Sequence, residues 1–257
     1  MPAEAETYDS SKIIVLEGAL GIRKRPSMYI GSTGAAGVIH LLYEVIDNSV
    51  DEADAGYCKS ITIKLSQDAD GDIAEVIDDG RGIPVDMMEK YNKSALEVIM
   101  TTLHKGAKFN SDVYKISGGL HGVGLTVVNA LSVYTEVTVK RNGHIYKQTY
   151  SKGIPTSKVE VLGDTNETGT TVKFKPDKEI FSVLTFDSGM LTERLRYTSF
   201  LKPKLDIIVI DDRFGAHDVQ KYETNEGIPA FIKFLDKDKT PLTQIIWSNR
   251  QEGQTII

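Results

Sequence analysis

The chain has 257 residues, of which 40% are hydrophobic, and this is typical of one large globular domain or of one domain followed by the start of a second. The formal net charge of −6 argues against a domain whose whole surface binds DNA, since such surfaces are usually basic. The single cysteine, Cys58, excludes an intrachain disulfide framework and a cysteine-based zinc site, and it is consistent with a reducing cytoplasm.

Residues 1–18 are predicted to form an extended N-terminal arm, because apolar residues are few in this stretch. Residues 1–11 are polar and acidic, and they lack the apolar core of a secretory signal. No apolar run approaches the roughly 20 residues that a membrane-spanning helix needs. We therefore expect a cytoplasmic protein that has no membrane partner.

The first predicted helix covers residues 38–55, where apolar side chains recur at i+3 and i+4 spacing and Gly56 follows as a stop. Two strands joined by a turn at Asp70-Gly71 are expected next. The second of them runs into residues 78–84, which must form a loop because two glycines and a proline punctuate the segment.

The later elements follow from the same periodicities, with Asn142-Gly143 as a second hairpin signal. The predicted helices are 38–55, 94–104, 125–131, 188–201 and 229–236. The predicted strands are 60–65, 73–77, 135–141, 144–150, 158–162, 170–175 and 205–210. Helices and hairpin-linked strands occur without regular β-α-β alternation. We therefore expect an α+β fold, a two-layer sandwich with helices on one face of a mostly antiparallel sheet.

The first chemical signal lies in the predicted helix 38–55, where Glu44 and Asn48 share one face at i and i+4. The amide oxygen of Asn48 can ligate Mg²⁺ beside phosphate oxygens, and a carboxylate one turn away can orient and deprotonate a water molecule. Taken alone, the acidic residues of this helix are more often a solvated surface.

The second signal is the loop Asp78-Asp79-Gly80-Arg81-Gly82-Ile83-Pro84. A carboxylate at the end of a strand can accept a hydrogen bond from an exocyclic amine such as that of adenine. The glycines allow the backbone to approach a flat ring closely. A tight turn in which aspartate serves only turn chemistry is an equally good reading of this loop by itself.

The third signal is the run from Gly118 to Gly124, which has four glycines in seven residues and leads into a predicted helix. Such a run describes a phosphate cradle, in which backbone N–H groups point at the anion. It is not a Walker A loop, because Leu125 stands where a lysine should be, and it lacks the G-x-G-x-x-G spacing of dinucleotide-binding proteins. A flexible loop without a ligand is the alternative. The polar residues 105–117 upstream are a candidate lid that supplies positive charge.

Together and in this order, the three segments resemble the hallmarks of the GHKL ATPase superfamily. Two longer segments are more specific. Residues 22–31, Ile-Arg-Lys-Arg-Pro-Ser-Met-Tyr-Ile-Gly, and residues 114–124, Tyr-Lys-Ile-Ser-Gly-Gly-Leu-His-Gly-Val-Gly, resemble segments of type IIA DNA topoisomerase B subunits. Other GHKL proteins lack both. Small departures occur at Ser27, at Asp54 and in residues 105–109, and the last of these alters the predicted lid hinge.

The resemblance implies the GHKL or Bergerat ATP-binding fold with an eight-stranded sheet. It also implies three regions: an arm at 1–18, the ATPase domain at 19–225, and the start of a transducer domain, cut short, at 226–257. ATP and Mg²⁺ are the implied cofactors. The implied activity is that of an ATP-hydrolysing DNA topoisomerase, in which ATP drives dimer-gate closure and DNA strand passage. The outcome is supercoiling in gyrase, or relaxation and decatenation in topoisomerase IV.

Roles for individual residues follow from the same resemblance. Glu44 is the implied general base, with His40 in support, and Asn48 is the implied Mg²⁺ ligand. The implied ATP-binding residues are Asn48, Asp78, Arg81, Gly82, Ile83, Pro84, Lys108, Tyr114, Gly119, Leu120, His121, Gly122, Val123, Gly124, Thr170 and, from the arm, Tyr8. Aminocoumarin-type inhibitors are expected at Asp78, Arg81, Pro84, Arg141 and Thr170, although Arg141 could equally be a salt-bridged or solvated residue.

The implied partners are DNA, the topoisomerase A subunit, and a second B subunit that Tyr8 and the arm would reach. Two alternatives are weaker. One is another GHKL ATPase, such as an Hsp90-like chaperone or a MutL-like repair clamp, and the other is a nucleotide-binding module without hydrolysis. The sequence does not separate gyrase from topoisomerase IV.

Overall fold

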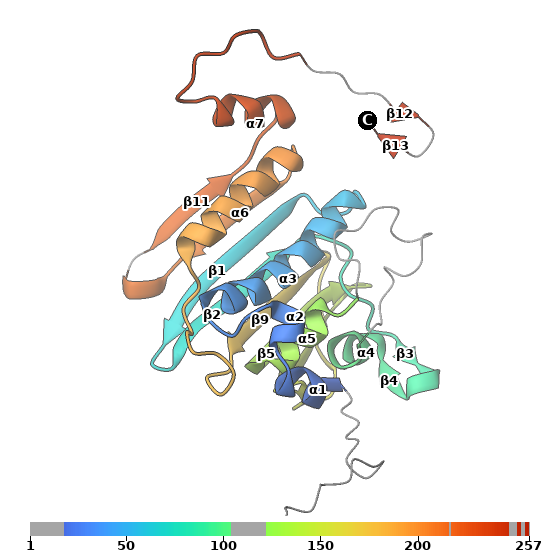
Figure 1. The fold of residues 1–257 in the computed structure, drawn as a ribbon. Coiled ribbons are helices and arrows are strands. Elements are labelled where there is room, and N and C mark those ends of the chain that lie inside the picture. The colour runs from blue at the N-terminus through green and yellow to red at the C-terminus, as the bar shows by residue number, and fades with distance from the viewer. Residues whose placement is uncertain (1–17, 104–121, 216, 247–250, 253–254, 257) are drawn as a thin grey trace, which may run out of the picture.

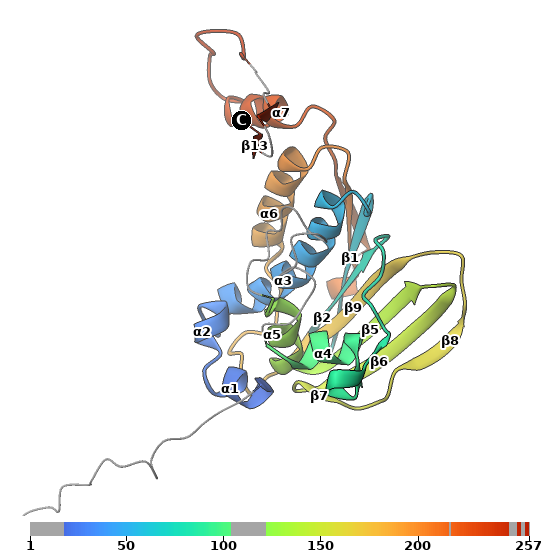
Figure 2. The ribbon, with the colours of Figure 1, turned by 90° about the vertical axis from the view of Figure 1, so that its right-hand side faces the viewer.

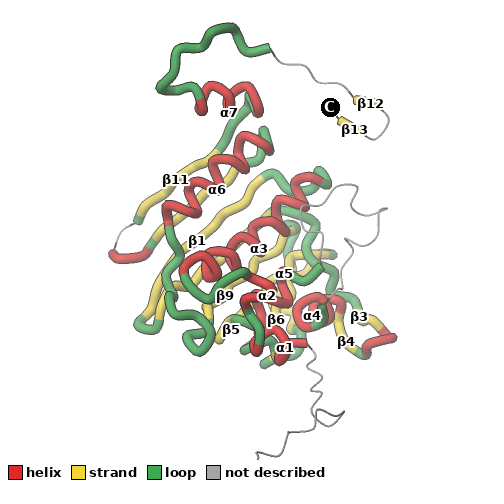
Figure 3. Tube along the Cα trace, in the orientation of Figure 1, coloured by secondary structure: helices red, strands yellow, loops and turns green. Residues whose placement is uncertain are grey.

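The structure is a computed structural model, and it describes residues 18–103, 122–215, 217–246, 251–252 and 255–256 (Figure 1). The described chain forms two layers. In Figure 2 the helices cover one side of a large twisted sheet and leave the other side open. Figure 3 shows the same division by type of element, and it confirms the α+β sandwich expected from the sequence.

The main sheet of the described residues has nine strands in the order β11-β10-β1-β2-β9-β5-β6-β7, with β8 paired to β6 off this path. Of the strand pairs in this sheet only β1 and β10 are parallel, so the described sheet is mostly antiparallel as expected. The strands are β1 (Ser60–Asp68), β2 (Gly71–Asp78), β5 (Ser132–Arg141), β6 (His144–Ser151), β7 (Ile154–Pro155), β8 (Glu160–Asp164), β9 (Gly169–Pro176), β10 (Asp206–Asp211) and β11 (Asp218–Tyr222).

The expected number of strands was eight, so the count differs by one. The residue patterns predicted neither β7 nor β11. β7 has two residues and follows a turn in which Lys152 and Gly153 both have positive φ (52° and 84°). β11 is an exposed edge strand that buries none of its residues, so it shows no alternation of apolar and polar side chains.

The helices of the described chain are α1 (Gly18–Lys24), α2 (Ser27–Ile30), α3 (Ala35–Asp54), α4 (Ala95–Thr101), α5 (Gly124–Ala130), α6 (Ser188–Leu201) and α7 (Ile228–Leu235). Small elements are the hairpin strands β3 (Met87–Met88) and β4 (Lys93–Ser94), β12 (Gln251–Glu252), β13 (Thr255–Ile256), and 3₁₀ turns at Glu89–Tyr91 and Arg213–Gly215. All five predicted helices are present, and α6 has the predicted bounds.

Two hairpin turns are predicted from the sequence, and the structure confirms one and shifts the other by one residue. The turn at Asn142-Gly143 is confirmed, with φ of 53° and 84°. The first hairpin turns one residue earlier than predicted. Asp68 pairs with Gly71, so Ala69 and Asp70 form the turn and Gly71 already belongs to β2.

The core lies between α3 and the sheet. Strands β1 and β2 alternate buried and half-buried residues over 60–66 and 71–77, as expected for a sheet with one covered face. On the open face a row of alternating charges crosses five strands: Lys64 is opposite Glu75, Glu75 is opposite Lys173, Lys173 is opposite Glu136, and Glu136 pairs with Lys147 at 2.6 Å. These opposite-charge pairs keep the uncovered face solvated.

Near the C-terminal end, α7 packs on α6 through aromatic rings. Phe231 stacks on Phe200 at 5.3 Å between ring centroids and meets Tyr197 edge-on at 5.5 Å. The domain boundary expected near residue 225 stays a prediction, since the contacts between α6 and α7 run across it.

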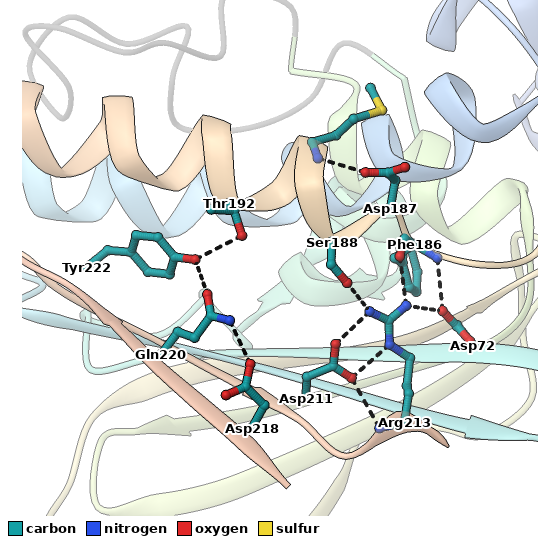
Figure 4. A network of polar contacts seen from close by, with 11 residues as sticks. Asp72, Phe186, Asp187, Ser188, Thr192, Asp211, Arg213, Asp218, Gln220 and Tyr222 are labelled. Atoms are coloured by element: carbon teal, nitrogen blue, oxygen red, sulfur yellow. Dashed lines mark hydrogen bonds and ion pairs between the residues drawn. The ribbon is translucent and has the colours of Figure 1, made fainter. Parts of the chain in front are cut away.

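A buried arginine joins the start of α6 to the sheet (Figure 4). Arg213 is 2% exposed, and its guanidinium binds Asp72, Asp211, the Ser188 hydroxyl and the Phe186 carbonyl. A buried charge is tolerated only when it is paired and hydrogen-bonded in this way. Arg213 therefore fixes where α6 begins relative to β2 and β10.

Replacing Arg213 with leucine should lower the free energy of unfolding by about 3–5 kcal/mol, because the buried Asp72 carboxylate loses its partner. Urea unfolding followed by circular dichroism measures the change. Lys178→Gln, which removes an exposed ion pair with Asp70, is the matched control and should leave the midpoint nearly unchanged. An Arg213→Leu midpoint equal to that of the control would contradict this role.

Candidate active site

Helix α3 carries three of the predicted site residues on one stripe. His40, Glu44 and Asn48 follow one another at i+4 spacing and are half-buried, while the neighbouring face of the helix is buried in the core. The His40 Nε2 lies 3.1 Å from the Glu44 Oε1. This hydrogen bond is the main reason that the pKa of His40 is raised above its usual value of 6.5. The pair therefore holds the Glu44 carboxylate in a defined orientation.

Asn48 directs its side-chain N–H at the helix, where it donates to the carbonyl oxygen of Glu44. With the amide in this orientation, the Oδ1 atom is the one suited to a cation. No cluster of three or more His, Cys, Asp or Glu side chains with metal-binding geometry occurs among the described residues. A cation at Asn48 would thus need water and ligand oxygens to complete its shell, which is how Mg²⁺ usually binds beside phosphates.

Asp78 ends β2 directly across from α3. Its Oδ2 accepts a hydrogen bond from the Ser49 hydroxyl at 2.9 Å, and its Oδ1 accepts from the backbone N–H groups of Gly80 at 2.9 Å and Thr170 at 3.2 Å. Burial raises the pKa of this carboxyl, and the hydrogen bonds oppose that effect. Asp78 is therefore a fixed acceptor that belongs at once to the helix layer and to the sheet.

Close backbone contacts explain the glycines around Asp78. A Cβ on Gly169, which has a φ of +148°, would lie 2.1 Å from the Asp78 carbonyl oxygen. A Cβ on Gly82, at φ +77°, would lie 2.8 Å from the Lys140 carbonyl oxygen. Only glycine fits either position. The ends of β2 and β5 and the start of β9 consequently meet at one point.

Two arginines lie at this meeting point. Arg81 donates to both carboxylate oxygens of Glu52 at 3.0 and 2.8 Å, and its guanidinium lies 3.9 Å above the centre of the Tyr57 ring. Arg141 donates to the carbonyl oxygens of Gly82 at 2.7 Å and of Arg81 at 3.3 Å. Its Nε atom is buried and has no hydrogen-bond partner in the part of the chain that the structure describes. Both cations thus line the loop that follows Asp78.

The other predicted residues of this loop lie in the same place. Ile83 donates its backbone N–H to the Thr170 hydroxyl at 3.3 Å, and Pro84 follows it. This contact joins the loop to β9.

The end of the glycine-rich run reaches Glu44. Gly124 opens α5, and a Cβ there would lie 2.2 Å from the Glu44 Oε2. Thr126 and Asn129 of α5 donate to the carbonyl oxygens of Ile99 and Met100, and so fix α5 against the end of α4. Gly122 and Val123 lie just before this contact in the chain, and the phosphate-binding role predicted for this run stays a prediction.

The remaining predicted residues lie outside the described residues: Tyr8, Lys108, Tyr114, Gly119, Leu120 and His121. The structure brings together His40, Glu44, Asn48, Asp78, Arg81, Gly82, Ile83, Gly124, Arg141 and Thr170. Sequence reasoning did not assign a role to Ser49, Glu52, Tyr57 or Gly169, although each lies beside a predicted residue in the chain or in the three-dimensional site.

Among the described residues, no helix is both long enough and apolar enough to span a bilayer.

Comparison with known proteins agrees with this geometry. Residues 34–180 match the family model described as "Histidine kinase-, DNA gyrase B-, and HSP90-like ATPase". Over 247 residues the chain is 50% identical to the DNA gyrase B protein of Thermotoga maritima, with 96% of this chain and 38% of that protein covered. Over 239 residues it is 48% identical to the DNA gyrase B protein of Clostridium acetobutylicum, covering 93% of this chain and 37% of that protein. The chain thus spans less than half the length of these relatives.

A solved structure shares the fold. The "43K ATPase domain of Thermus thermophilus gyrase B in complex with an aminocoumarin" superposes with a TM-score of 0.80 at 38% identity, covering 93% of this chain and 60% of that one. The matched residues 34–180 contain the stripe on α3, Asp78 and Thr170. The chain therefore belongs to the histidine kinase-, DNA gyrase B- and HSP90-like ATPase family, and nearly its whole length is similar to the ATPase domain of type IIA topoisomerase B subunits.

Proposed function

We propose that the site on α3, β2 and β9 binds ATP with Mg²⁺ and hydrolyses it. One observation carries this proposal: the Glu44 carboxylate is oriented by His40, has Asn48 one turn further along α3, and meets the end of the glycine-rich run at Gly124. Asp78 lies at the other end of the same site, as an acceptor for the adenine amine. A general base, a cation ligand, a phosphate-binding segment and an adenine acceptor are the parts that the reaction needs.

Hydrolysis is the transfer of the γ-phosphoryl group to water. A bond forms between the water oxygen and the γ-phosphorus, the bond from that phosphorus to the bridging oxygen breaks, and ADP leaves. Glu44 takes the proton of the attacking water, and His40 keeps the carboxylate pointed at it. Mg²⁺, when bound at Asn48, offsets the negative charge of the phosphates. Lys108 and the amides of residues 119–124 would hold those phosphates.

At the adenine end, Asp78 accepts a hydrogen bond from the exocyclic amine, and Thr170 helps to orient the adenine. Gly82, Ile83 and Pro84 lie along the adenine ring. Tyr114 would contact the ring, and Tyr8 would come from a second copy of the chain. Arg81 and Arg141, with Asp78, Pro84 and Thr170, are the groups we assign to binding of an aminocoumarin, the class of ligand present in the Thermus thermophilus complex.

In the longer protein that its relatives exemplify, we assign this ATPase to dimer-gate closure and DNA strand passage in the cytoplasm, with DNA, an A subunit and a second B subunit as partners. The similarity to gyrase B proteins favours supercoiling over the decatenation of topoisomerase IV. It also argues against an Hsp90-like or MutL-like task. A non-hydrolytic module is disfavoured, because such a module has no use for the His40–Glu44 pair.

Glu44→Gln keeps the shape of the side chain and removes its basicity. Phosphate release should fall at least about 100-fold, since general bases contribute roughly 10²–10⁴-fold, while affinity for a non-hydrolysable ATP analogue stays within about threefold. Glu75→Gln, on the open face of the sheet, is the control and should match the wild type. Turnover that is undiminished in Glu44→Gln would exclude Glu44 as the base.

Asp78→Asn should weaken nucleotide binding roughly 10- to 100-fold, because a hydrogen bond to a charged group contributes about 1.5–3 kcal/mol. Titration calorimetry with the same ATP analogue measures the change. Asp79→Asn is the matched control. The Asp79 carboxylate accepts from the backbone of Lys59 and Ser60 instead, so affinity should be retained. Equal affinities of the two variants would remove Asp78 from the adenine contact.

The pKa of the His40 imidazole should lie above its usual value in the wild type and should fall in Glu44→Gln, because the hydrogen bond to Glu44 is the largest cause of the raised pKa. A raised folded-state pKa means that this pair stabilises the fold fully below the unfolded value and loses its effect as the pH rises through the folded value. NMR titration of the imidazole protons provides the measurement. Resonances of the other histidines should not respond to the substitution, and an unchanged His40 pKa would contradict the pairing.

A further inference from the structure

Helices α3 and α6 run side by side in the same direction (Figure 1). Three polar contacts join them at a nearly constant offset of 147, 147 and 148 residues: Tyr43 to Met190, Asp47 to Arg194, and Asp54 to Lys202, the C-cap residue of α6. Since each helix rises about 1.5 Å per residue, equal offsets mean that the two helices stay in register over roughly 17 Å. Helix α6 therefore packs in register along α3.

The contacts lie next to the proposed catalytic groups. Tyr43 precedes Glu44 in the chain, and its hydroxyl donates to the Met190 carbonyl at 2.9 Å. Asp47 precedes Asn48, and its two carboxylate oxygens accept from the Arg194 guanidinium at 2.9 and 3.0 Å. The same guanidinium lies 5.2 Å from the centre of the Tyr43 ring. Arg194 thus touches both residues that flank the stripe of Glu44 and Asn48.

Helix α6 is itself held to the sheet, so it can act as a fixed reference. The Asp187 side chain caps its first turn by accepting from the Met190 N–H at 2.8 Å. Arg213 binds Ser188, and the Tyr222 hydroxyl of β11 donates to Thr192 at 3.0 Å (Figure 4). Ser188 and Thr192 lie on the side of α6 that faces the sheet, and Arg194 lies about two turns beyond the Asp187 cap.

We infer that α6 positions the base-bearing helix α3 for hydrolysis and that Arg194 is the positioning residue. The inference rests on the proposed ATP hydrolysis. The strands against which α6 packs are β10 and β11, whereas the groups assigned to adenine lie at the end of β2 (Asp78), in the loop after it (Gly82) and near the start of β9 (Thr170). Glu44 is carried by α3, whereas Asp78 belongs to β2 and accepts from Gly80 and Thr170 as well as from Ser49 of α3. Attack on the γ-phosphorus tolerates little displacement of the base. Loss of Arg194 consequently affects turnover more than nucleotide binding.

The test compares kcat, KM and the Kd of a non-hydrolysable ATP analogue in the full chain. Arg194→Gln should lower kcat about tenfold, with KM and Kd within about threefold of the wild type. Arg194→Lys keeps a charge that can pair with Asp47, so its kcat should recover to within about threefold. Lys202→Gln removes the contact with Asp54 at the C-terminal ends of α3 and α6, and it should give a smaller decrease in kcat, again without a change in Kd.

Lys221→Gln is the matched control. It removes the ion pairs of a β11 lysine that is as exposed as Arg194, 47% against 46%, and whose partners, Asp206 and Glu223, lie outside α3 and α6. All three constants should equal those of the wild type. Melting temperatures are recorded for every variant. If Arg194→Gln does not fold, the kcat of Lys202→Gln relative to Lys221→Gln decides the matter in its place.

An unchanged kcat in Arg194→Gln would overturn the inference, and so would a fall in kcat that a parallel rise in Kd accounts for. Failure of the proposed function looks different, since the wild type would then release no phosphate. If the wild type hydrolyses ATP, Glu44→Gln does not, and Arg194→Gln matches the wild type, then the base assignment stands and only the role of α6 is lost.

Discussion

The burial of one side of α3 against the sheet is the constraint on which the site depends. Val38, Leu42, Val45, Ile46 and Ser49 are all buried on this helix. Because an α-helix has 3.6 residues per turn, fixing the direction of that face also fixes the direction in which every other stripe of side chains points. The stripe of His40, Glu44 and Asn48 comes to lie at the edge of the core, and the stripe of Tyr43 and Asp47 turns toward α6. The packing of this one face thus gives the helix three sides: one buried in the core, one that carries the candidate site residues, and one that contacts α6.

Asp78 shows how the sheet completes what the helix begins. A desolvated carboxylate is costly unless it is hydrogen-bonded, and three donors from three segments converge on this one. Ser49 is on α3, Gly80 is in the loop, and Thr170 is the second residue of β9. The group that we assign to adenine recognition is therefore also a joint between the two layers. A site built on such a joint is rigid, because its acceptor cannot move without breaking contacts in both layers.

Much of this arrangement could be predicted from local sequence signals. The spacing of Glu44 and Asn48, the punctuated loop after Asp78, the turn at Asn142-Gly143 and the bounds of α6 all depend on residues within a few positions of one another. The partners of those residues could not be predicted in the same way. Thr170 is 92 residues from Asp78, so only the family resemblance, and no local signal, assigns it to the same site. Arg194 is 147 residues from Asp47, and only the completed fold brings these two together. Strands β7 and β11 escaped prediction for another reason, since two residues or an exposed edge produce no periodic pattern.

At two glycines of the site an added Cβ would come too close to a neighbouring oxygen, but the reason that the position needs glycine differs. At Gly169 an added Cβ would meet the carbonyl oxygen of Asp78, a backbone atom that cannot move without shifting the end of β2. The positive φ at this position adds strain for any other residue. At Gly124 the added Cβ would meet the Glu44 carboxylate, the far end of a flexible side chain, and the backbone there imposes no positive φ. The first glycine is thus required by the fold. The second is required by the orientation of the Glu44 side chain, because the fold could accept a methyl group at residue 124 once Glu44 turned away from His40 and from the end of the glycine-rich run.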